Sequence, residues 1–445
     1  MSAESDKGAD KPPPKKAQSK GKKAKKARPR KKQPKGLAVY TEGGAVPAWV
    51  TAARTVLVLA LAASIPFVLG VEPGRRLFWA AAIAILPVSW VTFGYHLWRR
   101  LCPLAVLAQL GRLLGKPGQK RVNAKSWLAK NYLLLQMGLM LVALTLRLTM
   151  TNGTPMALAA FLAVAVVSAV TVGFIFTGKT WCNYICPVGM VEKFHTEPAR
   201  LTGLKNSQCS PCTACKKNCP DIDLEQGYWK EFLLPARRLA YFAWPGIVLA
   251  FYVYYYLVAG NWDYYFSGAW TLEDTQITTL LAPGLFFFEA IPIVAAAPLT
   301  LIVFGAASMG IFGLLESLAI KRTAGTDADI ARIRHRSLAM AGFVAFIIFY
   351  YFGGQPTIRM LPGWIGAGFS TAVAVAATAI MVRRWRRSES DFVQEKFAEK
   401  ILKKWEWGDE PESDRLQDIY LLHHERKKER DSRIDAYKET VREMV

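Results

Sequence analysis

Long apolar runs separated by short polar segments dominate the pattern of hydrophobic and polar positions along this chain of 445 residues. A run of about 20 apolar residues is long enough to cross the hydrocarbon core of a bilayer as a helix. The runs leave no polar face for water, which argues against a large soluble helical core. Eight runs have this character: 46–70, 77–97, 131–150, 155–178, 239–259, 291–319, 337–353 and 364–382. The sequence therefore predicts an all-α polytopic membrane protein of about eight transmembrane helices.

Basic residues are distributed unevenly over the loops between these runs, and this predicts the orientation of the chain. Loop 98–130 holds eight Lys or Arg and no acidic residue, and loop 320–336 holds five against two, whereas loop 259–290 holds none. Positive loops face the cytoplasm. We therefore expect a multi-pass protein of a bacterial-type inner (cell) membrane with cytoplasmic N- and C-termini and a cytoplasmic segment 179–238.

Both ends of the chain are strongly charged. Residues 1–36 carry fourteen Lys or Arg against three acidic residues and supply much of the net charge of +23. This composition predicts a disordered basic tail. A topology determinant is favoured over binding to lipid headgroups, and no nucleic-acid partner is expected. Region 383–445 is interpreted as a cytoplasmic amphipathic and charged helical tail whose first arginines lie at lipid headgroups: Arg383, Arg384, Arg386 and Arg387.

Four cysteines fall within eleven residues, in the spacing Cys-x2-Cys-x2-Cys-x3-Cys-Pro. This is the bacterial ferredoxin run for a [4Fe-4S] cluster. A structural zinc site would need a second short pair of ligands, and seven cysteines, an odd number, in a long chain do not indicate a disulfide framework. The predicted cluster ligands are Cys209, Cys212, Cys215 and Cys219. The acidic side chains that follow the run are interpreted as solvated charges: Asp221, Asp223 and Glu225.

The other three cysteines also stand in Cys-Pro turns after apolar runs. Cys182 and Cys186 form a Cys-x3-Cys-Pro turn after the fourth run. Cys102 forms a similar turn after the second run, with Trp98 where a first cysteine would stand. The two segments look like an internal repeat. The chain then divides into a basic tail (1–36), a four-span bundle with a Cys-Pro turn at 98–104 (46–178), an iron–sulfur segment (179–238), a second four-span bundle (239–382) and the helical tail (383–445).

These motifs resemble a known family, the membrane polyferredoxins related to the NapH and NosR accessory proteins of nitrate and nitrous oxide reduction. The resemblance rests on Trp181–Gly189, on the degenerate copy Trp98–Leu104 and on the run Cys209–Pro220, and it covers about residues 77–225. It implies electron transfer between the quinone pool and a partner reductase. The chain differs in having one cysteine in its first turn and one full ferredoxin run where two are usual.

The ferredoxin rule that a fourth cysteine ligates the other cluster suggests how the ligands divide. Cys186 would then complete the first cluster beside Cys209, Cys212 and Cys215. Cys219 would join Cys182 and Cys102 at a second site with three thiolates. That site could hold a cluster with a ligand other than cysteine, a three-iron cluster or no cluster.

Three histidines lie near the ends of apolar runs: His96, His195 and His335. His96 and His195 stand within ten residues of a cysteine and are candidates to complete the second site. Haem is not expected, because the chain has no Cys-x2-Cys-His attachment motif. Hydrogen-bonded histidines between helices are the favoured interpretation.

The aromatic segment 251–270 is interpreted as an interfacial belt. A quinone pocket near the outer face would use the same segment, with Asp263, Glu273 or Glu289 taking protons. Arg147 and Glu316, near the ends of apolar runs, are candidates for functional charges in the membrane, and snorkelling to the interface is the alternative.

The sequence thus predicts an iron–sulfur electron-transfer protein of the membrane. It would pass single electrons between an unidentified cytoplasmic partner and the quinone pool or a membrane reductase. A carrier or an oxidoreductase subunit is favoured over a stand-alone enzyme. The alternatives are a redox-sensing or assembly accessory protein for a metalloenzyme, and a transporter with a regulatory cluster.

Overall fold

Long helices make up most of the computed structural model. It describes residues 40–404, with gaps at 42–43, 46, 72, 80–83, 117, 124, 199–218, 324 and 359–360, together with residue 432. All of these belong to one compact unit, Gly36–Val445. The predicted basic tail, the ferredoxin-run residues Cys209, Cys212 and Cys215, and most of the region after Lys404 lie outside the described residues.

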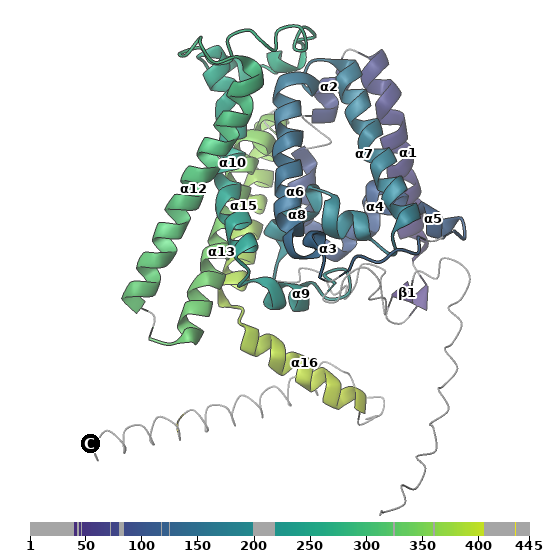
Figure 1. The fold of residues 1–445 in the computed structure, drawn as a ribbon, viewed down its shortest axis with the longest axis vertical. Coiled ribbons are helices and arrows are strands. Elements are labelled where there is room, and N and C mark those ends of the chain that lie inside the picture. Colours follow the sequence, from purple (N-terminus) through teal and green to yellow (C-terminus); the bar gives the residue numbers. More distant parts are fainter. Residues whose placement is uncertain are drawn as a thin grey trace, which may run out of the picture. The chain divides into compact units, whose positions relative to one another are not determined.

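Seven described helices are long and apolar enough to cross a membrane by length and composition. They confirm the predicted all-α membrane fold (Figure 1). The seven are α1 (Ala48–Gly70), α6 with the π-helix η2 (Trp127–Thr151), α7 (Pro155–Ile175), α10 (Pro235–Ala259), α12 (Ile293–Thr323), α13 with the π-helix η5 (Asp327–Gly354) and α15 (Gly363–Arg386).

The predicted second span, 77–97, is not among these seven. Its place is taken by α3 (Ala84–Leu101), which leaves helical geometry at Gly94 with φ 75°. The last turns of α3 carry His96, Arg99 and Arg100, all of them buried. The described part of the chain has seven candidate spans, and the predicted second span stays a prediction because residues 80–83 within it lie outside the described residues.

Short elements connect the long helices. A two-stranded antiparallel ladder joins β1 (Tyr40–Thr41) to β2 (Gly44–Ala45). The short helices are α2 (Pro73–Leu77), α4 (Pro103–Leu107), α5 (Leu110–Leu113), the π-helix η3 (Trp181–Ile185), α8 (Val188–Thr196), α9 (Leu224–Glu231), α11 (Asp263–Phe266), the 3-10 helix η4 (Ala269–Thr271), α14 (Gln355–Ile358) and α16 (Glu389–Lys404). Figure 1 shows η3, α8 and α9 at the same end of the bundle as the start of α1 and the end of α15.

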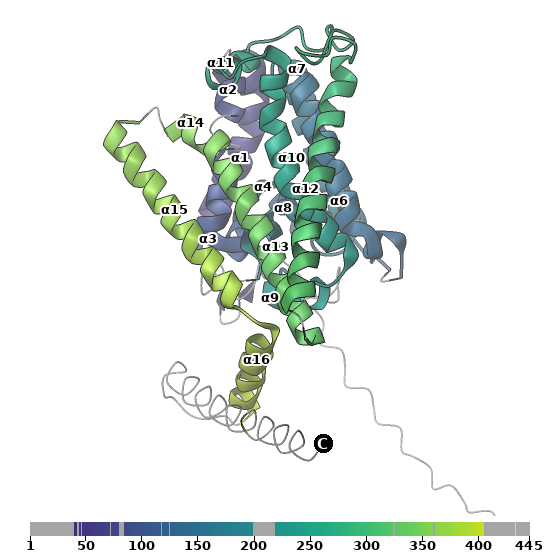
Figure 2. The same cartoon turned by 90° about the vertical axis from the view of Figure 1, so that its left-hand side faces the viewer.

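Helix α10 lies at the centre of the bundle. About two thirds of its apolar window (67%) is buried, against 6% for α1 and for α15. It packs along α12 and α13 (Figure 2). The Ser308 hydroxyl donates to the Phe242 carbonyl at 2.7 Å, which ties α12 to α10. The hydrophobic core takes side chains from both predicted four-span bundles; the boundary between them stays a prediction.

The aromatic segment 251–270 is largely core and not the predicted interfacial belt. The Tyr252 ring stacks on Phe352 at 5.0 Å. The guanidinium of Arg147 lies over Trp79 at 4.1 Å and over Phe251 at 4.5 Å, so it packs inward instead of snorkelling. The reason is that α10 is the central helix, whose aromatic side chains fill the bundle. Six members of the segment are buried: Phe251, Tyr252, Tyr254, Tyr255, Tyr265 and Trp270.

Three further charged groups differ from the sequence-based expectation. Glu316 is buried and forms ion pairs with Arg238 and with Arg334, the latter at 3.7 Å, so it binds α12 to α10 and α13. Arg384 is buried, and Arg387 forms a bidentate ion pair with Glu225 of α9 at 2.6 and 3.0 Å. These two arginines therefore serve packing between helices and not contact with lipid headgroups.

Close contact between α10 and α12 depends on Gly246. A Cβ atom at this position would lie 2.0 Å from the Phe304 carbonyl oxygen. We expect Gly246→Ala to force the helices apart and to lower the unfolding free energy by about 1–3 kcal/mol. The measurement is thermal unfolding in detergent, followed by tryptophan fluorescence. Gly310→Ala on α12 is the control, since nothing lies within 4 Å of its Cβ. Equal midpoints for the two variants would contradict the packing argument.

Candidate iron–sulfur site

Two Cys-Pro turns share one backbone conformation. Cys102 has φ −52° and ψ 119°, and Cys186 has φ −56° and ψ 117°. A residue before proline is disfavoured in the helical region, so α3 and η3 each end at such a cysteine and a new helix starts at or just after the proline. Each turn is closed by a backbone hydrogen bond of 2.8 Å. The Cys102 N–H donates to the Trp98 carbonyl, and the Cys186 N–H donates to the Trp181 carbonyl. This agreement is what an internal repeat predicts.

Three thiols are gathered by these turns. Cys102, Cys182 and Cys186 pack in one small apolar cluster with Trp181 and alanines of α4 and α7. The N–H of Gly189 donates to the Cys186 carbonyl at 3.1 Å, which closes the turn at the start of α8. Soft sulfur donors gathered in one cluster fit an iron–sulfur site. We call this group the thiol trio.

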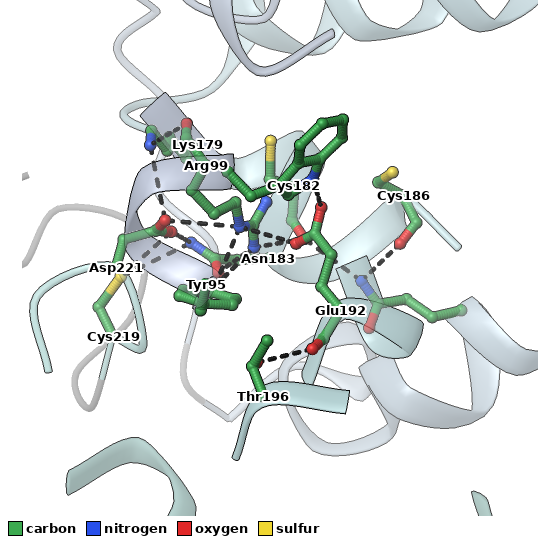
Figure 3. A network of polar contacts seen from close by, with 12 residues as sticks. Tyr95, Arg99, Lys179, Cys182, Asn183, Cys186, Glu192, Thr196, Cys219 and Asp221 are labelled. Carbon is green, nitrogen blue, oxygen red and sulfur yellow. Dashed lines mark hydrogen bonds and ion pairs between the residues drawn. The ribbon is translucent and has the colours of Figure 1, made fainter. Parts of the chain in front are cut away.

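Cys219 lies beside a different set of side chains. Its sulfur is 3.6 Å from Asn183 Nδ2 and 3.9 Å from Asp221 Oδ2 (Figure 3). Asn183 directly follows Cys182, so the end of the ferredoxin run is joined to the Cys-Pro turn. The structure thus places Cys102, Cys182 and Cys186 in one cluster, whereas the sequence suggested Cys219 as the third residue beside Cys102 and Cys182. The assignment of each cysteine to a cluster stays a prediction.

Four buried charges lie beneath the turns, and we call them the charge frame: Arg99, Lys179, Glu192 and Asp221. Arg99 Nε is 3.0 Å from Glu192 Oε2 and 3.6 Å from Asp221 Oδ1. Lys179 Nζ is 3.5 Å from the same Asp221 oxygen (Figure 3). All four side chains are at most 3% exposed, and two positive charges balance two negative ones. Buried charges persist only when paired in this way.

The frame and its neighbours hold the turns through their carbonyl groups. Arg99 Nη2 donates to the Cys182 carbonyl at 3.3 Å. Gln136 Nε2, from the span α6, donates to the Cys186 carbonyl at 2.9 Å. Trp98 Nε1 donates to Glu192 Oε1 at 2.8 Å. Trp98, which stands where the other turn has its first cysteine, therefore holds a carboxylate of the charge frame. The turns are therefore fixed by hydrogen bonds from two separate helices, α3 and α6.

Burial keeps the trio protonated in the absence of metal. It raises the pKa of the Cys102 thiol to about 11 and that of Cys182 to about 12. Burial also acts to raise the pKa of Asp221, but Arg99 and Lys179 outweigh it and hold this pKa well below the usual range. Metal ligands must be thiolates, so cluster assembly has to release protons here.

Sequence reasoning missed the charge frame. Asp221, expected to be solvated, is fully buried (0% exposed). The available signal was position: Arg99 stands three residues before Cys102, and Asp221 stands two after Cys219. From sequence alone, a charged residue beside a cysteine turn is expected to be solvated, because its ion-pair partner lies on a distant segment.

The remaining candidates fall in different places. Both ring nitrogens of His335 are hydrogen-bonded, Nδ1 with Tyr228 at 2.8 Å and Nε2 with the Arg384 carbonyl at 2.6 Å. His195 packs against Trp90 and Phe346. Glu273 lines a cavity of about 40 Å³ with Tyr254, Tyr255 and Tyr264, whereas Asp263 and Glu289 are exposed. The predicted quinone pocket at this end of α10 stays a prediction.

The fold and the site define a multi-pass membrane protein with an iron–sulfur site. Residues 158–195 match a family model described as a 4Fe-4S binding domain. The match covers most of α7, all of η3 and most of α8, and it contains Cys182 and Cys186. No curated protein and no solved structure matched the chain. The predicted [4Fe-4S] cofactor is thereby confirmed.

No three His, Cys, Asp or Glu side chains among the described residues are placed to hold a single metal ion. Ligands of one zinc ion all lie about 2.0–2.3 Å from it. The thiols of a cluster instead bind separate iron atoms, which suits the trio.

Asp221→Asn tests the charge frame. The change leaves Arg99 and Lys179 buried with one carboxylate fewer, so we expect a loss of about 3–5 kcal/mol of unfolding free energy. Thermal unfolding in detergent measures it, with the exposed Asp327→Asn as the control. Adding Lys179→Met to Asp221→Asn should restore part of the loss. Wild-type stability in the single variant would refute the frame.

The pH dependence of this difference has a definite sign. The folded pKa of Asp221 is depressed by Arg99 and Lys179, while the unfolded value is about 3.9. The contribution of the carboxylate is therefore fully present above about pH 4 and is lost as pH falls toward the folded pKa. The gap between wild type and Asp221→Asn should narrow below about pH 4.

Proposed function

We propose that this chain is a membrane-bound iron–sulfur electron-transfer protein. It passes single electrons between a cytoplasmic partner and the quinone pool or a membrane reductase. The observation that carries this proposal is the thiol trio, which packs in one cluster and includes both cysteines of the segment that matches a 4Fe-4S binding domain. A [4Fe-4S] cluster, when bound, supplies one-electron transfer.

All seven cysteines are proposed as cluster ligands: Cys102, Cys182, Cys186, Cys209, Cys212, Cys215 and Cys219. The close packing of Cys102 with both Cys182 and Cys186 favours a cluster site at the trio. The rule of exchanged fourth cysteines would instead give Cys186 to the ferredoxin run. Iron content distinguishes one cluster from two. Variants of single cysteines distinguish the two assignments of Cys186, to the trio or to the ferredoxin run.

The protein's own residues hold and shield the site. Trp181 and the alanines of α4 and α7 pack against the trio, in which Cys182 and Cys186 are buried and Cys102 is partly buried. The charge frame is neutral in sum, so it fixes the turns without adding net charge beside the cluster. Burial, hydrogen bonds to sulfur and local charge are the factors by which a protein sets a cluster's reduction potential.

The position of the site supports a cytoplasmic partner. The Cys-Pro turns lie at the end of the bundle where α1 starts and α15 ends (Figure 1). Basic loops are the reason to place this end in the cytoplasm, in a bacterial-type inner membrane. The resemblance to NapH- and NosR-related polyferredoxins suggests a reductase as the partner of the carrier.

The two alternative functions, a transporter with a regulatory cluster and a redox-sensing or assembly protein, predict different features. A transporter needs ionisable groups along a path through the membrane. The buried Glu316 instead forms ion pairs with Arg238 and Arg334 that join three helices. A redox sensor or assembly protein would hold a cluster that no quinol reduces, which is an experimental distinction.

Iron content tests the cofactor and the ligands together. Protein purified without oxygen should hold about four irons per chain for one cluster, or about seven or eight for two. Cys186→Ser should lose cluster absorbance and alter the electron paramagnetic resonance signal of the reduced protein. Ser210→Ala, inside the ferredoxin run but not a ligand, is the control. Colourless wild-type protein without iron would end the proposal.

Reduction by quinol tests the carrier role. In membrane vesicles that contain the protein, a quinol or a reduced ferredoxin should bleach the cluster within the time of enzymatic turnover. Cys186→Ser vesicles provide the background. A cluster that neither donor reduces would support the sensor or assembly alternative.

A further inference from the structure

A small cavity lies where α8, α13 and α15 meet, close to the last turn of α15. Its volume is about 20 Å³. A cavity of about 10–15 Å³ is enough to hold one water molecule. It therefore admits a single particle of about that size and no organic ring. We call it the inner cavity, and its walls are mostly apolar: Val91, His195, Gly342, Phe343, Phe346, Ala377, Ile380, Met381 and Arg384.

Arg384 brings a positive charge to this apolar wall. Its side chain is 4% exposed. No carboxylate among the described residues forms an ion pair with it, and its Nε has no hydrogen-bond partner there. Removing a charge from water is costly unless an opposite charge pairs with it. The guanidinium of Arg384 therefore calls for a counter-charge at the cavity.

The acidic side chains of the neighbouring segments are paired with other arginines. Glu197, two residues after His195, forms an ion pair with Arg237. Glu225 forms an ion pair with Arg387 at 2.6 Å. Segment 199–218, which lies outside the described residues, contains no Asp or Glu in its sequence. These parts of the chain supply no carboxylate to Arg384, which favours an anion taken up from solution.

His195 supplies a second polar group at the same cavity. It is 3% exposed, and its Nδ1 has no hydrogen-bond partner among the described residues. Burial and the charge of Arg384 lower the pKa of His195 to about 3, so the ring is neutral near pH 7. A neutral imidazole that carries its proton on Nδ1 donates one hydrogen bond from that atom. The cavity thus offers N–H donors from two side chains, which suits an anion and not a cation.

Size and charge together select the class of anion. Sulfate, phosphate and carboxylates have several heavy atoms, whereas chloride is a single atom little larger than the oxygen of water. A water molecule would fit the same volume but would leave the charge of Arg384 unbalanced. Arg383 and Arg386 are exposed on the same last turn of α15, and Arg336 of α13 is half-buried. Positive charges of this kind raise the local concentration of small anions.

We propose that the inner cavity binds a monatomic halide, chloride under cellular conditions, with Arg384 as its counter-charge and His195 as a hydrogen-bond donor. The ion would join the end of α8 to α13 and α15. Helix α8 begins just after Cys186 and Pro187, so the ion would also stabilise the packing of this Cys-Pro turn against two spans. This inference goes beyond the proposed electron transfer and does not depend on it.

The test is thermal unfolding of the full-length protein in detergent, followed by tryptophan fluorescence, while chloride replaces gluconate at constant ionic strength. A ligand that binds the folded state raises the unfolding midpoint as its concentration rises. We expect a rise of about 2–5 °C with chloride and with bromide. Arg384→Met should abolish this rise, and His195→Leu should raise the chloride concentration needed for it several-fold. Arg383→Met, at an exposed position on the same helix, is the matched control and should keep the wild-type response.

Three results would overturn the site. The first is the same chloride response in Arg384→Met as in wild type. The second is a wild-type midpoint that does not change with chloride, which would assign the cavity to water. The third is a chloride response that disappears when an anionic phospholipid is added, which would assign Arg384 to a lipid phosphate. If Arg384→Met does not fold, Arg384→Lys replaces it and should need a higher chloride concentration than wild type; an unchanged response in both Arg384→Lys and His195→Leu would then overturn the proposal.

Discussion

The pairing of Arg99 with Asp221 and Glu192 is the interaction on which the rest of the site depends. It joins the end of α3, the residue after Cys219-Pro220 and the middle of α8, three segments far apart in the chain. A single one of these charges left buried without its partner would cost several kcal/mol. The segments are therefore constrained to meet in one arrangement, and the cysteines they carry are held in place by the protein before any cluster binds. Lys179 completes the charge balance and ties the start of η3 to the same point.

The membrane bundle and the described part of the site are packed together. Gln136, in the middle of a candidate span, is fully buried and donates to the Cys186 carbonyl. Arg387 at the end of α15 clamps Glu225 of α9, close after the ferredoxin run in sequence. Both contacts make the position of the cysteine turns a property of the packed helices. The central place of α10, which contacts α6, α12 and α13, supports this arrangement from the other side.

Much of this could be predicted from the sequence. Apolar run length predicted the seven candidate spans, and cysteine spacing predicted the cofactor that the family comparison confirms. The second run, 77–97, includes residues 80–83, which lie outside the described residues, so this span stays a prediction. The aromatic residues near Tyr255 were assigned to the lipid interface because side-chain type in a membrane protein does not separate lipid-facing from core positions. Asp221 and Glu192 were missed because the burial of a charge depends on a partner from a distant segment.

The hydrogen bond of Trp98 bears on why one Cys-Pro turn has a tryptophan where the other has a cysteine. Its indole donates to Glu192, and Glu192 also holds Arg99. A cysteine at position 98 would regain the motif of the other turn, but it would remove a hydrogen bond from a carboxylate that has no access to water. Glu192 would then keep Arg99 as its partner but lose its second one, so a cysteine at position 98 would cost about 1–3 kcal/mol unless the cluster offset it.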